Sequence, residues 1–363
     1  MRVSLGLAGR GLLCVLASAA LTAALPPTAA APAPGEAARI PFSERYRATQ
    51  HGGIVRAANA SATCETPVVA EAPSCEAARE GAAGVNGQYE MTYIDLDDDP
   101  NTYNSSQAEL RLPPGARVTY ARLYWGGNLR VGEQKPPEDN GRVLIAEPGG
   151  NYKELLADTV VGHRTTGLMD GYTASADVTD LVADSGSGYY TVGQVNVAKG
   201  RTSAGAWGGW TLVAAYAHPN EPLRHLAIMD GYEALASDRR TLDITVEDLP
   251  VPAGADGSLG VVAYDGDRGH ADESLTVRAG DAPAMRVRDE ANPADDFMNS
   301  TITDHGRPGP GRLPAHPNTL GYDSDVYGIT PALEHGGDSL TLRFTTSGEG
   351  YQLGALFVQA EAS

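Results

Sequence analysis

The sequence predicts an all-β protein of two packed, jelly-roll-like β-sandwiches with a disulfide-pinned N-terminal arm. Glycine (43 residues) and proline (24 residues) are abundant in a chain of 363 residues. Long helical periodicity is nearly absent, and short runs of alternating apolar residues recur between turn-rich segments. The spacing of these runs favours a sandwich over a fold of alternating strands and helices.

Residues 1–30 have the pattern of a signal peptide. Arg2 and Arg10 give a positive start, residues 11–25 form an apolar run, and residues 28–30 are small enough for cleavage. The apolar run is short for a stable membrane span. The pattern therefore predicts a secreted, extracellular protein with no membrane span after cleavage of the signal peptide.

Residues 31–84 are predicted to be a linker and an N-terminal arm. Cys14 falls in the signal peptide, so the mature chain keeps Cys64 and Cys75, an even number in an oxidising compartment. We predict a disulfide between them, because no histidine lies nearby to complete a zinc site. Residues 40–59 are expected to lie as an extended arm on the main body, and residues 76–84 to form a short helix.

Residues 85–220 are predicted to form the first sandwich. Residues 117–125 alternate with period two, which is typical of a strand. One face carries Val118, Tyr120, Arg122 and Tyr124, and the other carries Thr119, Ala121, Leu123 and Trp125. Both faces carry apolar bulk, so we expect this strand to lie between two layers. The apolar segment 207–217 is expected to be a central strand.

Residues 221–363 are predicted to form the second sandwich, after a turn at residues 218–222. Alternating runs there predict strands at 223–229, 241–246, 257–264, 273–277, 285–288, 299–303, 339–345 and 351–359. The longest loop, residues 304–319, contains four prolines. We expect it to cross the surface without regular structure.

An acidic loop directly precedes the alternating strands of the first sandwich. Asp95, Asp97, Asp99 and Asn101 occur at alternate positions, a spacing that lets side-chain oxygens converge on Ca²⁺. The run contains no glycine and no closing glutamate, so it is not an EF-hand loop. The alternative is a solvated acidic turn between two strands.

Two further Asp-x-Asp pairs occur in the second half of the chain. They are Asp265 with Asp267 and Asp323 with Asp325. Each pair is compatible with Ca²⁺, the one cofactor that the sequence suggests, although such pairs more often reflect ordinary loop polarity.

The composition and the aromatic residues restrict the class of partner. A formal charge of −19 argues against nucleic acid and against anionic membranes, because both attract basic proteins. Trp125 and Trp210 lie in strongly apolar strands and are expected in the core. Trp207 precedes a glycine pair and is the tryptophan expected to be exposed, where it would stack on a sugar ring.

The motifs of common enzymes are absent from the sequence. It contains no Gly-x-Ser-x-Gly elbow, no His-Glu-x-x-His helix and no phosphate-binding glycine loop. We therefore predict a non-catalytic binding or surface-associated protein, stabilised by calcium, whose extracellular ligand is a glycan or a surface protein. The alternative is a secreted hydrolase that acts on polysaccharide or cell wall.

Several segments together resemble an uncharacterised domain of secreted and surface bacterial proteins. They are TYIDLDDDPNTYNSSQAELRLPPGA, ARLYWGG, ADVTDLV, GYYTV, GWTLVAAY, LGVVAYDGD, FMNSTI and LGYDSDVY. That domain often precedes immunoglobulin-like repeats, and the resemblance implies location and class only. Residues 176–182, with the glycine turn and strand after them, are similar to a segment of galactose-binding-like jelly rolls, which is a likeness of fold and not of function.

Overall fold

The computed structural model describes residues 35–97, 99–348 and 350–362. The predicted signal peptide lies outside these residues. Within them the chain is mostly strand, as predicted. The helical segments are α1 (Cys75–Arg79), α2 (Thr179–Ser185) and the 3₁₀ turns η1 (Asn86–Gln88), η2 (Pro137–Asp139) and η3 (Thr330–Leu333). None of the helices in the described part of the chain is long and apolar enough to cross a membrane.

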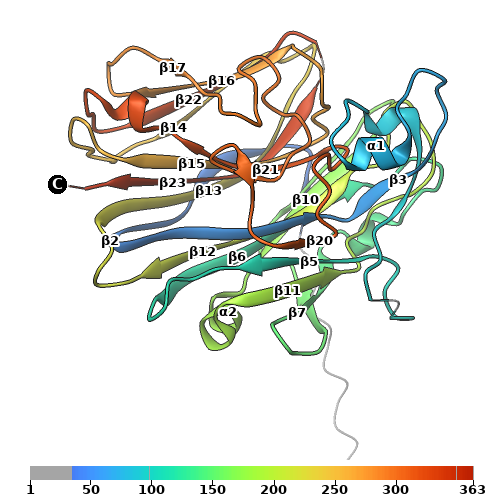
Figure 1. Cartoon of the computed structure of the whole chain (residues 1–363), viewed down its shortest axis with the longest axis horizontal. Coiled ribbons are helices and arrows are strands. Elements are labelled where there is room, and N and C mark those ends of the chain that lie inside the picture. Colours follow the sequence, from blue (N-terminus) through green and yellow to red (C-terminus); the bar gives the residue numbers. More distant parts are fainter. Residues whose placement is uncertain (1–34, 98, 349, 363) are drawn as a thin grey trace, which may run out of the picture. The chain divides into compact units, whose positions relative to one another are not determined.

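In the described residues, the strands form one large sheet and three smaller ones (Figure 1). The large sheet has twelve strands in the order β1 (Glu36–Ala37), β9 (Val161–Thr165), β10 (Asp170–Asp177), β6 (Arg117–Asn128), β12 (Gly208–Ala217), β2 (Ile40–Ala60), β13 (Leu223–Leu235), β23 (Tyr351–Glu361), β15 (Gly257–Tyr264), β21 (Tyr322–Gly328), β18 (Thr303–Asp304) and β19 (Arg307–Pro308). The second sheet contains β20 (Arg312–Leu313), β5 (Ser105–Leu110), β11 (Gly188–Gly193), β7 (Arg142–Ala146) and β8 (Lys153–Leu156). The third contains β14 (Thr241–Val246), β22 (Leu340–Thr346), β16 (Glu273–Ala279) and β17 (Met285–Arg286), and β3 (Ala62–Pro67) pairs with β4 (Tyr89–Tyr93).

Strand β2 joins the two halves of the large sheet. Its residues 40–51 pair with β13, and its residues 52–60 pair with β12. At the crossing, a Cβ on Gly52 would lie only 1.9 Å from the carbonyl oxygen of Tyr216, and the φ angle of Gly52 is +151°. Only glycine accommodates both the angle and the close approach. The prediction that residues 40–59 lie on the main body as an arm is therefore wrong: they form a strand inside the sheet.

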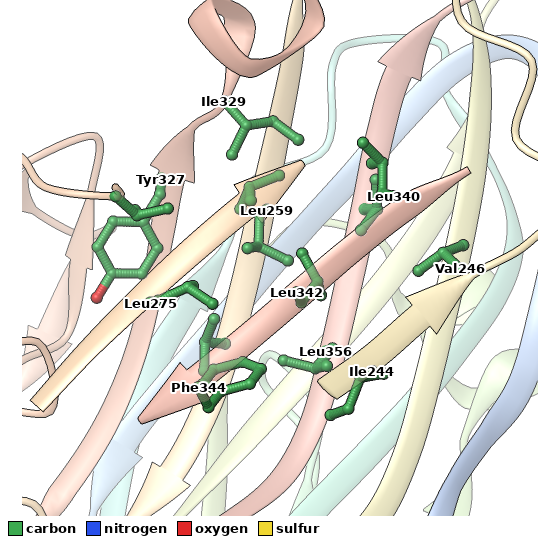
Figure 2. Packing of buried hydrophobic residues seen from close by; sticks show 14 of the residues in the cluster. Ile244, Val246, Leu259, Leu275, Tyr327, Ile329, Leu340, Leu342, Phe344 and Leu356 are labelled. Atoms are coloured by element: carbon green, nitrogen blue, oxygen red, sulfur yellow. The ribbon is translucent and has the colours of Figure 1, made fainter. Parts of the chain in front are cut away.

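Each half of the large sheet packs against one of the smaller sheets. The second sandwich encloses a core between β13, β23 and β15 on one side and β14, β16 and β22 on the other. Figure 2 shows Leu259, Leu342, Phe344 and Leu356 pointing toward one another in this core. Full burial of such a side chain contributes about 1.5–3 kcal/mol.

The first sandwich has its own core. The buried side chains Leu123, Trp125 and Leu212 of the large sheet pack with Ile145 and Val192 of the five-stranded sheet. The buried residues of this core lie between residues 57 and 214 of the sequence, and those of the second core lie between residues 227 and 360. The two cores thus lie on either side of the turn at residues 218–222, where β12 ends and β13 begins.

A third apolar cluster lies where the two sandwiches meet. Tyr124 and Val213 of the first sandwich belong to it, together with Ile228, Tyr264 and Phe357 of the second. Because Leu123 and Trp125 face the first core while Tyr124 faces this cluster, β6 is buried on both sides. The prediction that this strand lies between two layers is confirmed.

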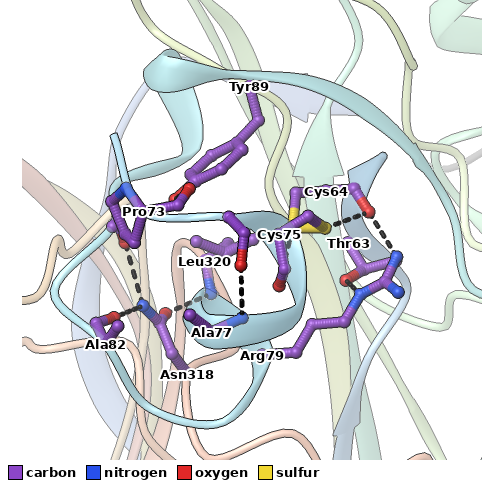
Figure 3. Close-up of a disulfide and its surroundings, with 12 residues drawn as sticks. Thr63, Cys64, Pro73, Cys75, Ala77, Arg79, Ala82, Tyr89, Asn318 and Leu320 are labelled. Carbon is purple, nitrogen blue, oxygen red and sulfur yellow. Dashed lines mark hydrogen bonds between the residues drawn. A yellow bond between two sulfur atoms is a disulfide. The ribbon is translucent and has the colours of Figure 1, made fainter. Parts of the chain in front are cut away.

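The predicted disulfide joins Cys64 and Cys75, whose Cα atoms lie 5.7 Å apart. Figure 3 shows it beneath α1, with Arg79 reaching back to Thr63, where Nε donates a 3.1 Å hydrogen bond to Oγ1. The segment also contacts the second sandwich, because Asn318 Nδ2 donates to the carbonyl oxygen of Gly84 at 2.9 Å. The disulfide therefore fixes a segment that touches both sandwiches.

The proline-rich loop contains more structure than expected. Short strands β18, β19 and β20 interrupt residues 303–313, and β20 pairs with β5 of the first sandwich. Arg312 of β20 is 7% exposed. The prediction of a surface loop without regular structure is therefore wrong for this part of the chain.

Candidate functional site

The acidic loop between β4 and β5 uses its side chains to form its own turns. Asp97 Oδ1 accepts a hydrogen bond from the backbone N–H of Asp99 at 3.2 Å, and Asp99 Oδ1 accepts from that of Asn101 at 2.9 Å. Asp95 Oδ1 accepts from Ser105 Oγ at 3.0 Å. Side chains that bond the backbone two residues later are typical of tight turns.

The other two acidic pairs lie next to each other in the second sandwich. Asp323 and Asp325 lie inside β21 and are each 1% exposed, so they do not belong to a polar loop. Strand β21 pairs with β15, which leads directly into Asp265 and Asp267. A Cβ on Gly266 would lie 2.8 Å from Asp323 Oδ2.

The two buried carboxyl groups of β21 differ in their hydrogen bonds. Asp325 Oδ1 accepts from the backbone N–H of Thr303 at 2.7 Å and from its hydroxyl at 2.6 Å. Asp323 Oδ1 accepts from the N–H of Thr301 at 3.0 Å, and its Oδ2 has no partner within the described residues. Burial raises the pKa of Asp325 to about 6 despite its hydrogen bonds. Burial and the charge of Asp325 raise the pKa of Asp323 well above its usual value.

Calcium binding stays a prediction. In the part of the chain that the structure describes, no three His, Cys, Asp or Glu side chains are grouped as metal ligands. A comparison of melting temperatures with and without excess chelator tests the prediction. A lower melting temperature with chelator supports bound calcium. An unchanged melting temperature would show that calcium does not stabilise the protein.

A cleft of about 600 Å³ opens where the two sandwiches and the disulfide-held segment meet. We call it the end cleft. The first sandwich contributes the segment from Arg164 to Met169, and the second contributes residues 234–238, Asp265, Asp267, His270 and residues 350–352. Asn86, which lies just after the disulfide-held helix, completes the lining together with Ser203 and Ala204.

Two buried polar groups of the end cleft lack a hydrogen-bond partner within the described residues. Asn86 is 2% exposed and Tyr351 is 1% exposed, and neither Asn86 Nδ2 nor the Tyr351 hydroxyl has a partner there. Burial raises the pKa of Tyr351 well above its usual value, so the hydroxyl keeps its proton. Buried polar groups are normally paired, so two enclosed donors without a partner among the described residues are unusual features of this lining.

The remaining lining combines charged groups with apolar surface. Asp265 and Asp267 supply carboxylates, and Arg164 Nη2 lies 3.8 Å from Asp238 Oδ2. Leu168 and Met169 form the apolar rim, and the side chain of Leu168 is largely exposed. The cleft thus offers hydrogen-bond acceptors, hydrogen-bond donors and an apolar contact surface.

The backbone of Asp265 is held in an unusual conformation. Its φ angle is +66°, a region that non-glycine residues rarely occupy. A 2.8 Å hydrogen bond from its N–H to the carbonyl oxygen of Gly321 fixes this turn. Such conformations cost about 1–3 kcal/mol and gather at functional sites, so this turn supports a role for the end cleft.

Trp207 is not the exposed aromatic residue that the sequence predicted. It is 1% exposed, and its ring centroid lies 5.8 Å from that of Tyr264 in the cluster between the sandwiches. Added Cβ atoms on Gly171 and Gly321 would approach it to 2.8 and 2.6 Å. Glycines around the ring allow close packing, and Trp207 is not available for stacking on a ligand.

The sequence identified one part of the end cleft and missed the rest. Asp265 and Asp267 were candidates, whereas Asn86, Arg164 and Tyr351 carried no local signal. They lie far apart in the sequence and meet only through the fold. The Asp95 loop and Asp323–Asp325 do not line the end cleft.

Part of the chain is similar to a known protein family. Residues 80–253 match a family described as "Protein of unknown function (DUF3344)", which supports the resemblance to an uncharacterised domain. A comparison with curated proteins found no match.

Among solved structures, the chain is similar to the major capsid protein P2 of bacteriophage PM2. The identity is 14% and the TM-score 0.19, over 74% of this chain and 97% of that one. It is also similar to PNGase F, a glycosylasparaginase from Flavobacterium meningosepticum, with 12% identity and a TM-score of 0.20 over 74% of this chain and 94% of the enzyme. We infer no function from these likenesses, because TM-scores this low do not establish an equivalent site.

Proposed function

We propose that this chain is a secreted, non-catalytic binding protein that takes its ligand in the end cleft. The observation that carries the proposal is the convergence of three separate parts of the chain on one cleft of about 600 Å³. Clefts at the junction of two packed units are preferred places for ligand sites.

The polar groups of the end cleft favour a neutral, hydroxyl-rich ligand such as a glycan. Asn86 Nδ2 and the Tyr351 hydroxyl are donors without a partner in the described residues. Asp265 and Asp267 are acceptors in the same lining. A sugar ring presents hydroxyl groups that both donate and accept, next to apolar C–H faces that pack on side chains such as Leu168 and Met169.

Secretion is supported by the disulfide between Cys64 and Cys75. Disulfides persist in oxidising compartments and are rare in the cytosol. The signal-peptide pattern at residues 1–30 agrees with this. Detection of the mature protein in culture medium, with Ala31 as its first residue, tests the localisation.

Binding is tested by screening the purified protein on a glycan array and measuring the affinity of retained glycans by calorimetry. Tyr351→Phe removes one hydroxyl from the end cleft and is expected to weaken binding about fivefold, for ~1 kcal/mol of one lost hydrogen bond. Asp265→Asn tests whether a carboxylate of the cleft accepts hydrogen bonds from the ligand, and it is expected to weaken binding. Asp184→Asn, on the exposed end of α2, is the matched control and is expected to leave the affinity unchanged.

Two results would contradict the proposal. Retention of no glycan by the wild-type protein would remove the end cleft as a glycan site. Turnover of chromogenic glycosides that is lost in Asp267→Asn would instead establish the alternative, a polysaccharide hydrolase, since paired carboxylates are the groups that carry out glycoside hydrolysis.

A further inference from the structure

A second cleft between the sandwiches has the opposite electrostatic character. It has a volume of about 500 Å³, and its lining includes Arg56, Arg111 and Arg307. We call it the arginine cleft. It lies beside Gln359, near the end of β23, whereas the end cleft lies beside Tyr351 at the start of that strand. At about 3.3 Å per residue, the two clefts are roughly 25 Å apart along β23.

Arg56 is the central residue of the arginine cleft. It lies on β2 and is 4% exposed, on the strand face that Ile54 and Ala58 direct toward the cluster between the sandwiches. Its Nη2 donates to the carbonyl oxygen of Thr303, and its Nε has no partner within the described residues. Buried charges are normally paired, so an arginine without an ion pair in the described residues requires an explanation.

A second buried arginine lies close to the first. Arg312 is 7% exposed, its Nη2 donates to the carbonyl oxygen of His316 at 3.1 Å, and its Nη1 has no partner among the described residues. Burial and, to a smaller extent, the charge of Arg56 lower the pKa of Arg312 to about 10. Two like charges are therefore buried near each other, which disfavours both.

The acidic groups nearby compensate for this charge only in part. Asp325 and Asp304 act on Arg56 through space and raise its pKa, but burial outweighs them and the net pKa is lowered. Asp325 is already hydrogen-bonded by Thr301 and Thr303. The described residues therefore leave a net positive charge at this cleft, in a chain whose formal charge is −19.

Of the two buried arginines, Arg56 lines the cleft and Arg312 does not. A Cβ on Gly309 would lie 3.1 Å from Arg56 Nη1, so glycine at this position avoids crowding the guanidinium group. Arg307 lies on β19 and is exposed at the rim. Arg111 is paired with Glu109, its Nη2 lying 2.6 Å from Oε2.

We propose that the arginine cleft binds an oxyanion group of an extracellular ligand, with Arg56 at the base of the cleft and Arg307 at the rim. Carboxylate, sulfate and phosphate share the geometry that a guanidinium fork pairs with, and a partly buried site strengthens that pairing. The ligand class is thus an acidic molecule, such as a uronate, a sulfated sugar or a phosphate ester. This site is separate from the end cleft and does not depend on the function proposed for it.

The proposal is tested by calorimetric titration of the full chain with glucuronate, inorganic sulfate and inorganic phosphate, with glucose as the neutral counterpart of glucuronate. We expect saturable binding of at least one anion and none of glucose. The anion that binds identifies the source of the oxyanion. Arg307→Ala is expected to weaken its binding about tenfold, which corresponds to ~1.4 kcal/mol.

Three variants separate anion binding from general charge, from folding and from the end cleft. Arg288→Ala removes another exposed arginine outside the cleft and is expected to leave the affinity unchanged. Arg56→Lys keeps the positive charge but loses the forked guanidinium group. We expect this variant to bind the anion more weakly and to remain folded, as measured by circular dichroism. Tyr351→Phe, which tests the end cleft, is expected to have no effect on the anion.

Three results would overturn the proposal. The first is no saturable binding of any of the three anions. The second is equal anion affinity for the wild-type protein and Arg307→Ala. The third is an equal loss in Arg307→Ala and Arg288→Ala, which would show attraction to surface charge and not a site. In each case Arg56 would be a structural residue that holds β18 through the carbonyl of Thr303.

Discussion

The carboxyl groups of Asp325 and Asp243 respond to pH in opposite directions. Burial raises the pKa of Asp325 from 3.8 to about 6. At the surface, hydrogen bonds from the guanidinium group of Arg343 lower the pKa of Asp243 below 3.8. A group with a raised pKa binds its proton more tightly in the folded protein than in the unfolded chain.

The Asp325 carboxyl group is expected to make the protein less stable as the pH rises. Its contribution is fully present below pH 3.8 and is lost as the pH passes through about 6. A change of this size corresponds to about 3 kcal/mol at most. In Asp325→Asn we expect the fall in the free energy of unfolding between these pH values to be smaller, as measured by urea denaturation across that range.

Asp243→Asn provides the control of opposite sign. The lowered pKa of Asp243 contributes stability above pH 3.8 that is lost as the pH falls. Asp243→Asn should therefore reduce the loss of unfolding free energy at low pH. The change of the unfolding free energy between pH 4 and 6 should stay the same as in the wild-type protein. If Asp325→Asn and the wild-type protein show the same slope between pH 4 and 6, Asp325 does not titrate as its burial implies.

The sequence could not reveal these buried acids because their partners are distant. Asp323 and Asp325 are separated by the polar Ser324, and aspartate is normally a loop residue, so the segment has no apolar alternation typical of a strand. Thr301 and Thr303 arrive from a separate segment and supply the hydrogen bonds that permit burial. For Trp207 the error went the other way, since the sequence predicted exposure and the structure shows burial. The glycines that suggested exposure instead allow other segments to pack tightly on its ring.

Elements with local patterns were predictable, and elements defined by distant pairing were not. Strand β6 was predicted with both its faces, since its alternation lies within twelve residues. Strand β2 has mixed polarity over residues 40–51, which are mostly partly exposed, so its central place in the sheet left no local signal. The same limit applied to the end cleft, of which only the turn from Asp265 to Asp267 was visible.

The disulfide is expected to stabilise the segment around α1 (Figure 3). The double variant Cys64→Ala, Cys75→Ala should lose about 3 kcal/mol of unfolding free energy, because the unfolded chain is no longer restricted. Since the segment positions Asn86, ligand binding in the end cleft should weaken as well. Reductant should lower the melting temperature of the wild-type protein and leave that of the variant unchanged. Equal melting temperatures of the two proteins would contradict a structural role.

The crossing of β2 between the sandwiches depends on Gly52. Gly52→Ala places a methyl group 1.9 Å from the carbonyl oxygen of Tyr216 and is expected to cost about 3 kcal/mol or more. Gly254→Ala is the matched control: its φ angle is +76°, but nothing lies within 4 Å of the added atom. It should cost only about 1 kcal/mol. Equal losses in the two variants, measured by urea denaturation, would show that backbone strain alone matters at Gly52.

The whole molecule has two cores but one continuous large sheet in its described residues. Because β2 supplies paired backbone to both sandwiches, neither sandwich can unfold without exposing one edge of the other. We expect calorimetry to show a single transition with equal calorimetric and van't Hoff enthalpies. Two resolved transitions would mean that the sandwiches unfold independently in spite of the shared strand.

The position of β2 in the sequence has a consequence for how the protein is made. Ala60 must pair with Gly209, and His51 with Leu223. During synthesis β2 therefore appears early and waits with both edges unpaired until its partners emerge roughly 150 residues later. An extended segment with open edges is a target for aggregation, so we expect the nascent chain to benefit from a holding chaperone during that interval.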